Sequence, residues 1–152
     1  MSQELTIRKA VIEDLEQLTY LFDGYRLFYK KQSNIQGAKE FLSERIKIKD
    51  SVIIVAQLSN KILAGFVQLY PIFSSTRMKK LWLLNDLFVH EDHRGNKVSK
   101  SLIEGAKMIS NATHAAGLIL ETEKNNKTAN NLYVNTGFEL DQDHNYYSWE
   151  PK

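Results

Sequence analysis

The chain has 152 residues, 43% hydrophobic and 25% charged, which suits one globular domain with a core of its own. It contains no cysteine, which excludes disulfides, thiolate metal sites, iron–sulfur clusters and a cysteine nucleophile. The net charge of +2 does not indicate a nucleic-acid partner, for which a strongly basic surface is expected.

The chain start and the apolar runs bear on location. Residues 1–8 hold no apolar signal-peptide core and no cleavage site, so we expect no signal peptide. The longest apolar runs, such as Val52 to Ala56, fall far short of the ~20 residues of a membrane span. We therefore expect a cytoplasmic protein that binds no membrane.

The first third of the chain predicts one strand and two helices. Leu5 to Arg8 alternates apolar and polar residues, as a short strand does. Apolar residues at steps of three and four predict an amphipathic helix from Leu15 to Tyr29. Ser33 and Gln36 have the spacing of a capping box that would open a second helix, with Ala38, Phe41, Leu42 and Ile46 on one face.

Three strands follow. Ser51 to Leu58 and Ile62 to Tyr70 predict a hairpin around a tight turn. Pro71 ends the second strand or marks a sheet edge, because proline donates no hydrogen bond to the ladder. Lys80 to His90 is almost continuously apolar, which predicts a strand buried on both faces.

The second half alternates helices and strands. A polar turn leads into a helix from Val98 to Ile109, for which Gly117 is the expected C′ residue. A short strand over residues 118–120 follows.

The remaining chain predicts another helix and strands. The helix covers Thr128 to Asn135 and ends at Gly137, and Phe138 to Trp149 predicts one bent strand or two. The order predicts a single mixed α/β domain over residues 1–152, with an antiparallel meander and, at the strand–helix–strand crossover, a parallel pair.

The turn from Arg94 to Ser99 joins a buried strand to a helix. Such a turn points free N–H groups outward at the positive end of the helix dipole, which makes an anion site. Arg94 and Lys97 would add positive charge. The alternative is an ordinary polar turn, because a lone glycine-containing turn is a weak signal.

A second segment, Asn126 to Phe138, places Ala129, Leu132 and Tyr133 on one helix face. Taken alone, Tyr133 would be a core aromatic whose hydroxyl is satisfied locally.

Together these segments resemble the GNAT superfamily of acyl-CoA-dependent N-acetyltransferases. Arg94 matches the first position of the family's Q/R-x-x-G-x-G/A motif, whose two small residues are Lys97 and Ser99 in this chain. The downstream pattern N-x-x-A-x-x-L-Y-x-x-x-G-F is matched at every position, by Asn126, Ala129, Leu132, Tyr133, Gly137 and Phe138. The strand from Leu84 to Val89 resembles the family's pantetheine-binding strand.

The resemblance implies the GNAT fold, a mixed and mostly antiparallel central sheet with a parallel splayed pair, flanked by helices. It also implies acetyl-CoA as co-substrate. The implied cofactor-binding residues are Leu87, Phe88, Val89, Arg94, Gly95, Asn96, Lys97, Val98, Ser99, Asn126, Ala129 and Tyr133. No metal is implied, and a homodimer is an expectation from the family.

The implied reaction is direct attack of an amine on the thioester within a ternary complex. An alkyl ammonium, with a pKa near ~10.4, must first lose a proton. Asp86 is the candidate base or substrate anchor, with Glu121 and Glu123 as alternatives, or it is merely a paired strand-end carboxylate. A backbone N–H near Phe88 or Val89 would meet the oxyanion. Tyr133 is the candidate acid for the leaving thiolate.

The acceptor is expected to be a small amine, a polyamine, an amino acid, or the lysine or N-terminus of a protein. Phe22 to Tyr29 is rich in aromatic residues, and Tyr25, Tyr29 and Asp86 are the candidate substrate-binding residues, because aromatic faces and a carboxylate suit a cation. The same aromatic residues would equally form core or a dimer face.

Competing signals are weaker. His90-Glu91-Asp92-His93 lacks the H-E-x-x-H spacing of a zinc site. Arg77, Lys79 and Lys80 form only a short basic cluster. A different class of function, a CoA-binding or regulatory protein of this fold with little catalysis, stays open because of Lys97.

Overall fold

The computed structural model describes residues 4–152, and Met1 to Gln3 of the opening segment lie outside the described residues. The chain forms two compact units, a larger one that ends at Glu121 and a smaller one from Thr122 to Lys152.

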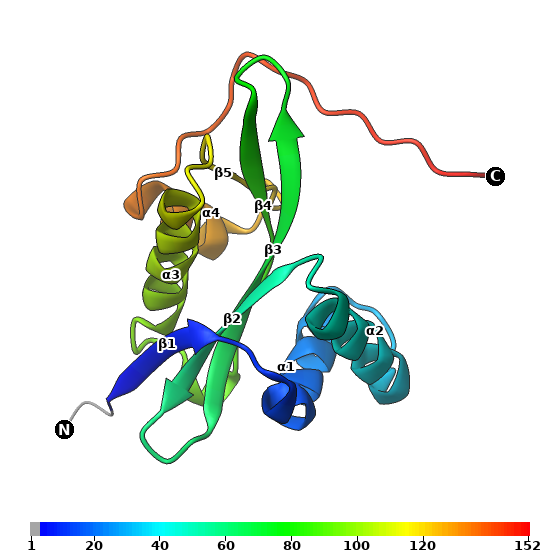
Figure 1. Cartoon of the computed structure of the whole chain (residues 1–152), viewed down its shortest axis with the longest axis vertical. Helices are drawn as coiled ribbons and strands as arrows, with labels where there is room; N and C mark the ends of the chain where they lie inside the picture. Colours follow the sequence, from blue (N-terminus) through cyan, green and yellow to red (C-terminus); the bar gives the residue numbers. More distant parts are fainter. Residues whose placement is uncertain (1–3) are drawn as a thin grey trace. The chain divides into compact units, whose positions relative to one another are not determined.

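The larger unit is built on one five-stranded sheet (Figure 1). Its strands, in spatial and chain order, are β1 (Leu5–Lys9), β2 (Val52–Leu58), β3 (Leu63–Ser74), β4 (Lys79–Val89) and β5 (Leu118–Ile119). The first four pair antiparallel, whereas β4 and β5 pair parallel. The predicted antiparallel meander and parallel pair are both confirmed.

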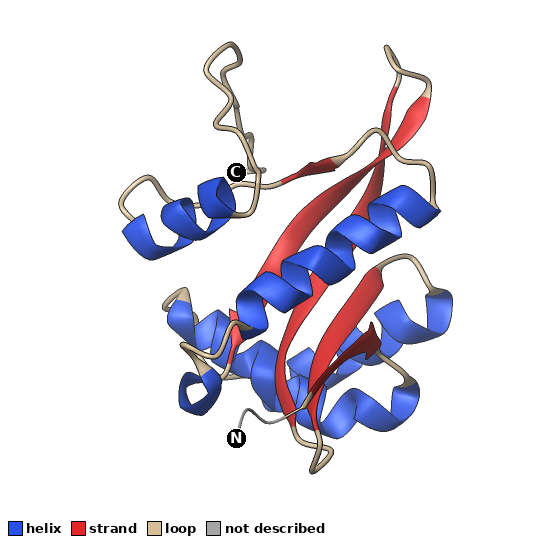
Figure 2. Cartoon of the chain, turned by 90° about the vertical axis from the view of Figure 1, so that its left-hand side faces the viewer, coloured by secondary structure: helices blue, strands red, loops and turns tan. Residues whose placement is uncertain are grey.

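Helices cover both faces of this sheet (Figures 1 and 2). They are α1 (Leu15–Phe28) and α2 (Ile35–Ile48) on one face and α3 (Val98–Ala112) on the other, with short 3₁₀ helices η1 (Ile12–Asp14) and η2 (Glu91–His93). Successive strand residues face opposite sides. Val55 and Phe66 accordingly join a buried cluster with α1 and α2, while Ile54 faces Gly105 of α3.

The start of α2 differs from the predicted capping box. Asn34, rather than Ser33, is the N-cap, and its Oδ1 accepts the N–H of Gly37 at 2.9 Å. Ser33 instead donates its hydroxyl to the buried carboxylate of Asp23 at 2.7 Å. The prediction was wrong by one residue because an adjacent polar residue competes for the same role.

The predicted end of α3 was also wrong. His114, not Gly117, is the left-handed residue after the helix, at φ +52°. The N–H of Ala115 reaches the carbonyl of Ser110 at 3.0 Å and that of His114 reaches Asn111 at 3.1 Å, the Schellman pattern. Gly117 lies further on, where its carbonyl accepts the N–H of Trp82 and so begins the β4–β5 pairing.

Two strand predictions are refined. β3 does not end at Pro71 but continues to Ser74, and β2 pairs with β3 only as far as Leu69 within the described residues. Pro71 therefore lies where one side of β3 is a sheet edge, the second of the two predicted alternatives. β4 is not buried on both faces, because Lys79 and Asn85 are exposed and Leu87 is half-buried.

In the smaller unit, α4 (Lys127–Asn135) forms as predicted and ends at left-handed Gly137. The predicted strand or strands from Phe138 to Trp149 do not form in the described residues. The carboxylate of Asp141 instead accepts the N–H groups of Asp143 and His144, a local turn that competes with an extended ladder.

Candidate active site

The middle of β4 carries a bulge. Asp86 pairs with Gln68 and Leu84 with Leu69, so Asn85 is one extra residue opposite a regular stretch of β3. A bulge bends its strand and increases the local twist. Within residues 4–152, β5 pairs with β4 only at Trp82 and Leu83, so β4 from Leu84 onward has no strand partner on this side. The parallel pair is therefore splayed.

The backbone of β4 beyond the bulge points groups into this open side. The N–H of His90 crosses to the carbonyl of Ala64 in β3 at 2.9 Å. Because the direction of backbone N–H and C=O groups alternates along a strand, those of Leu87 and Val89 point away from β3. The carbonyl of Val89 confirms this direction, since it accepts from Nε of Arg94 at 3.1 Å. Of the two candidates for the oxyanion, Val89 has the suitable direction and Phe88 does not.

Phe88 contributes its side chain rather than its backbone. Its ring packs against the core cluster under α1, and a Cβ added at Gly24 would lie 3.0 Å from the ring. The guanidinium of Arg94 lies 5.8 Å from the centre of the same ring. Arg94 is thus held on β4 by one hydrogen bond and one cation–π contact, which closes the turn onto the strand.

The turn after β4 alternates in backbone handedness. Arg94 is extended, Gly95 is left-handed at φ +78°, and Lys97 is left-handed at φ +61° before α3 begins at Val98. Such alternation directs consecutive N–H groups into one concavity. Lys97 thus adopts the conformation for which glycine is favoured, at the position where the motif has glycine.

The start of α3 adds further donors. The first intrahelical bond runs from the N–H of Ser101 to the carbonyl of Lys97 at 3.0 Å, so the N–H groups of Val98, Ser99 and Lys100 precede the helical ladder. Within the described chain no side chain caps this end. Asn96 is exposed, whereas Val98 is buried and offers only its backbone. These features fit a pyrophosphate.

Asp86 lies at the bulge, 3% exposed, on the sheet face covered by α1 and α2. Its Oδ2 accepts from Nε2 of Gln68 at 2.7 Å and its Oδ1 from Nδ2 of Asn85 at 3.0 Å. Burial raises the pKa of Asp86, and the hydrogen bonds from Gln68, Tyr25 and Asn85 oppose that rise. A carboxylate made more basic in this way suits proton acceptance.

Helix α1 brings aromatic residues to the same place. The hydroxyl of Tyr25 donates to the carbonyl of Asn85 at 3.2 Å, and the rings of Tyr25 and Tyr29 meet edge to face at 5.0 Å. The three predicted substrate-binding residues, Tyr25, Tyr29 and Asp86, are thus brought together. Phe22 of the same segment packs on Phe41 at 5.6 Å and belongs to the core.

Sequence patterns did not single out Gln68, Ser51, Asn85 or Tyr70. Gln68 is fully buried and accepts from the Ser51 hydroxyl at 2.9 Å. Burial and the charge of Asp86 raise the pKa of Tyr70 to about 12. The available signal was the lone polar residue within the apolar run from Phe66 to Leu69, because a buried amide requires partners.

The predicted residues of the smaller unit lie on α4. Asn126 is its N-cap and accepts the N–H of Ala129 at 3.1 Å. The half-buried ring of Tyr133 packs edge to face on Phe138 at 5.6 Å. That Tyr133 meets the thiolate near β4 stays a prediction, as does the role of the exposed Glu121 and Glu123.

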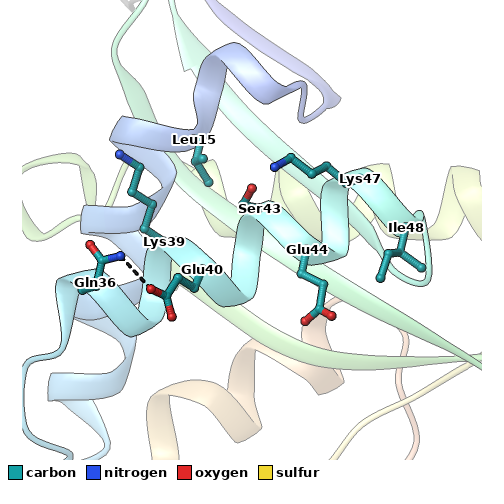
Figure 3. Close-up of a pocket in the computed structure, with 8 residues that line it drawn as sticks. All are labelled: Leu15, Gln36, Lys39, Glu40, Ser43, Glu44, Lys47 and Ile48. Carbon is teal, nitrogen blue, oxygen red and sulfur yellow. Dashed lines mark hydrogen bonds between the residues drawn. The ribbon is translucent and has the colours of Figure 1, made fainter.

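Other features of the described residues do not compete with this site. A hollow along α2 (Figure 3) carries lysines and glutamates in mixture, with Gln36 bonded to Glu40 at 2.7 Å. Within residues 4–152, no group of three or more His, Asp or Glu side chains is placed to hold a metal ion. No helix in that range is long and apolar enough to cross a bilayer.

The fold and the site define an acyltransferase of the GNAT type, and comparison with known proteins supports this. Residues 49–140 match the family model described as an acetyltransferase (GNAT) domain. The chain is 39% identical over 137 residues to the uncharacterized N-acetyltransferase YhfO of Bacillus subtilis, covering 90% of this chain and 91% of that protein. It is 30% identical to a probable acetyltransferase of Haemophilus influenzae, over 87% and 88%.

A solved structure agrees. The crystal structure of a probable acetyltransferase superposes with a TM-score of 0.92 at 36% identity, covering 97% of this chain and 98% of that one. The chain belongs to the GNAT acetyltransferase family.

Proposed function

We propose that the chain transfers an acetyl group from acetyl-CoA to a primary amine by direct attack within a ternary complex. The acceptor is a small amine, a polyamine, an amino acid, or the lysine or N-terminus of a protein. The observation that carries the proposal is the buried carboxylate of Asp86 at the β4 bulge, beside Tyr25 and next to the open side of β4.

The cofactor would be held by two sets of backbone groups. The alternating turn from Arg94 to Ser99 suits the pyrophosphate, and the outward groups of Leu87 and Val89 suit the amides of the pantetheine arm. Acetyl-CoA supplies an activated acyl carbon when bound.

The residues would then handle protons and charge. Less than about 0.1% of an alkyl amine is neutral at pH 7, so Asp86 takes a proton from the ammonium, directly or through water. The nitrogen lone pair attacks the acyl carbon, the Val89 N–H meets the oxyanion, and the carbon–sulfur bond breaks. The thiolate takes a proton from the Tyr133 hydroxyl, and the second proton lost by the attacking nitrogen returns to the tyrosinate through water.

The second candidate is a CoA-binding or regulatory protein with little catalysis. One observation favours it: Lys97 holds a left-handed backbone in the phosphate turn, where glycine is less strained. The two candidates differ in turnover, not in CoA binding.

The test is CoA release from acetyl-CoA with a panel of polyamines, amino acids, aminoglycosides and histone peptides. We expect turnover with at least one class. Tight CoA binding without turnover for any amine would support the second candidate. CoA at 100 times its Kd should add about 2.7 kcal/mol, a melting shift of roughly 5–10 °C. No shift at millimolar CoA would contradict both candidates.

The proposal includes a single functional domain over residues 1–152, a cytoplasmic location and a homodimer. Light scattering coupled to size exclusion would measure the mass of the particle against the 17.6 kDa of one chain. A monomer at all concentrations would remove the dimer from the proposal.

A further inference from the structure

A chain of hydrogen-bonded polar side chains runs from half-buried Ser51, just before β2, to the buried carboxylate at the β4 bulge. The hydroxyl of Ser51 donates to Oε1 of Gln68 at 2.9 Å, and Nε2 of Gln68 donates to Oδ2 of Asp86 at 2.7 Å. Gln68 is 0% exposed and Asp86 is 3% exposed. We call these three residues the Ser51–Gln68–Asp86 relay.

The direction of this relay is set at its Asp86 end. A glutamine amide has an accepting oxygen and a donating nitrogen, which are interchangeable by a 180° flip. An ionised carboxylate only accepts, so the amide nitrogen faces Asp86 and the amide oxygen accepts from the Ser51 hydroxyl. A flipped amide would set its oxygen against a carboxylate oxygen, which is repulsive.

Burying a glutamine amide costs free energy of folding that its hydrogen bonds must offset. Gln68 stands in an apolar strand between Val67 and Leu69, both fully buried, where an aliphatic residue would pack without needing partners. The oxygen and the nitrogen of its amide bond to the side chains of Ser51 and Asp86, respectively.

We propose that Gln68, held in place by Ser51, is a positioning residue for the acetyl transfer: it keeps Asp86 ionised and pointed at the acceptor amine. The proposal rests on the proposed function, in which Asp86 receives the proton. Gln68 itself touches neither substrate nor cofactor and acts through Asp86.

Other groups around Asp86 do not replace this role. Tyr25 of α1 and Asn85 of β4 also donate to the carboxylate. The charge of Asp86 raises the pKa of Tyr70 on β3. The charge of Arg45 on α2 lowers the pKa of Tyr70, and the charge of Asp50 raises it. Gln68 donates to Asp86 at 2.7 Å, against 3.0 Å for Asn85, and its amide oxygen also accepts from Ser51.

The test compares Gln68→Leu and Ser51→Ala with wild type. In Gln68→Leu the acid limb of the kcat/KM profile should move to higher pH, because Asp86 loses a donor to its ionised form. At pH 7, kcat/KM should fall about tenfold, the loss of one hydrogen bond to a charged group. Ser51→Ala should move the limb in the same direction by less, because Gln68 keeps its donor to Asp86 but its amide oxygen loses the partner that holds it in place.

Ser33→Ala is the matched control. It removes a hydroxyl from another buried carboxylate, Asp23, on the same sheet face. Stability should fall in this variant while the acid limb stays at the wild-type pH. An acid limb at the same pH in wild type, Gln68→Leu and Ser51→Ala would overturn the proposal.

A second readout separates this proposal from the proposed function. Carbon-13 NMR titration of the Asp86 carboxyl in the folded protein needs no turnover. A pKa that rises in Gln68→Leu and in Ser51→Ala supports the relay even if no amine is acetylated. An unchanged pKa in both variants overturns it, whatever the activity.

Discussion

Lys97 offers the sharpest test of the phosphate turn, because its backbone and its charge make separate predictions. The residue is exposed and left-handed at φ +61°, immediately before α3. A non-glycine residue in this conformation costs about 1–2 kcal/mol, whereas glycine adds about 0.4–1 kcal/mol of unfolded-state entropy. Lys97→Gly should therefore be more stable than Lys97→Ala by roughly 0.5–1 kcal/mol.

The assay is thermal unfolding of both variants, with CoA affinity measured by calorimetry. The stability difference corresponds to roughly 1–4 °C in Tm for a domain of this size. Both variants lose the same ammonium, so both should bind CoA about two- to fivefold more weakly, the effect of one exposed charge.

Lys49 supplies a control outside the turn. It is exposed at φ +59° after α2, so Lys49→Gly against Lys49→Ala should give the same gain in Tm without changing CoA affinity. A Lys97→Ala protein at least as stable as Lys97→Gly would refute the backbone argument. CoA binding that tightens in both Lys97 variants would refute the charge argument.

Three other predictions concern single side chains. Tyr133→Phe should lower kcat by about 10²–10⁴-fold and leave CoA affinity near wild type, and an unchanged kcat would remove Tyr133 from the mechanism. Asp86→Asn should abolish the acid limb of the pH–rate profile. It should not lower the free energy of unfolding at pH 7, because burial makes the ionised form of Asp86 unfavourable. A large loss of stability in this variant would indicate a purely structural carboxylate. Asp14 is held mainly by a bidentate pair with Arg8 at 2.7 and 2.8 Å, and although burial raises its pKa, these bonds and the Val11 N–H lower it overall. Its contribution is therefore complete above the unfolded pKa of about 4 and lost as the pH falls through the lower folded pKa; Asp14→Asn should cost about 1–3 kcal/mol in urea unfolding at pH 7 and little in strong acid.

Periodic patterns predicted the elements well, because burial of one face imposes them. The helix from Leu15 and the strand from Ser51 follow directly from apolar spacing, and the parallel pair follows from the crossover. Boundaries were less predictable. Ser33 and Asn34 compete for one cap, and His114 rather than a glycine takes the left-handed position after α3.

A motif named the turn at Lys97, strand position singled out Asp86 and aromatic density singled out Tyr25, and the roles of these residues stay predictions. The site was not predictable where function depends on three-dimensional pairing. Nothing in the order of residues says that Ser51 and Gln68, 17 positions apart, share a hydrogen bond, or that Asn85 is the unpaired residue of β4. Such features depend on strand register, which the pattern of the whole sheet sets.

The bulge at Asn85 is a single inserted residue. With Asn85 deleted, Leu84 would still stand opposite Leu69 and Asp86 opposite Gln68, now as consecutive pairs of a regular ladder. Every other residue of β4 would keep its sheet face, and the hairpin would still close. A hairpin without this residue would thus fold with the same pairs but a straighter strand. The difference between a straight hairpin and the bent one is therefore a single residue of chain length.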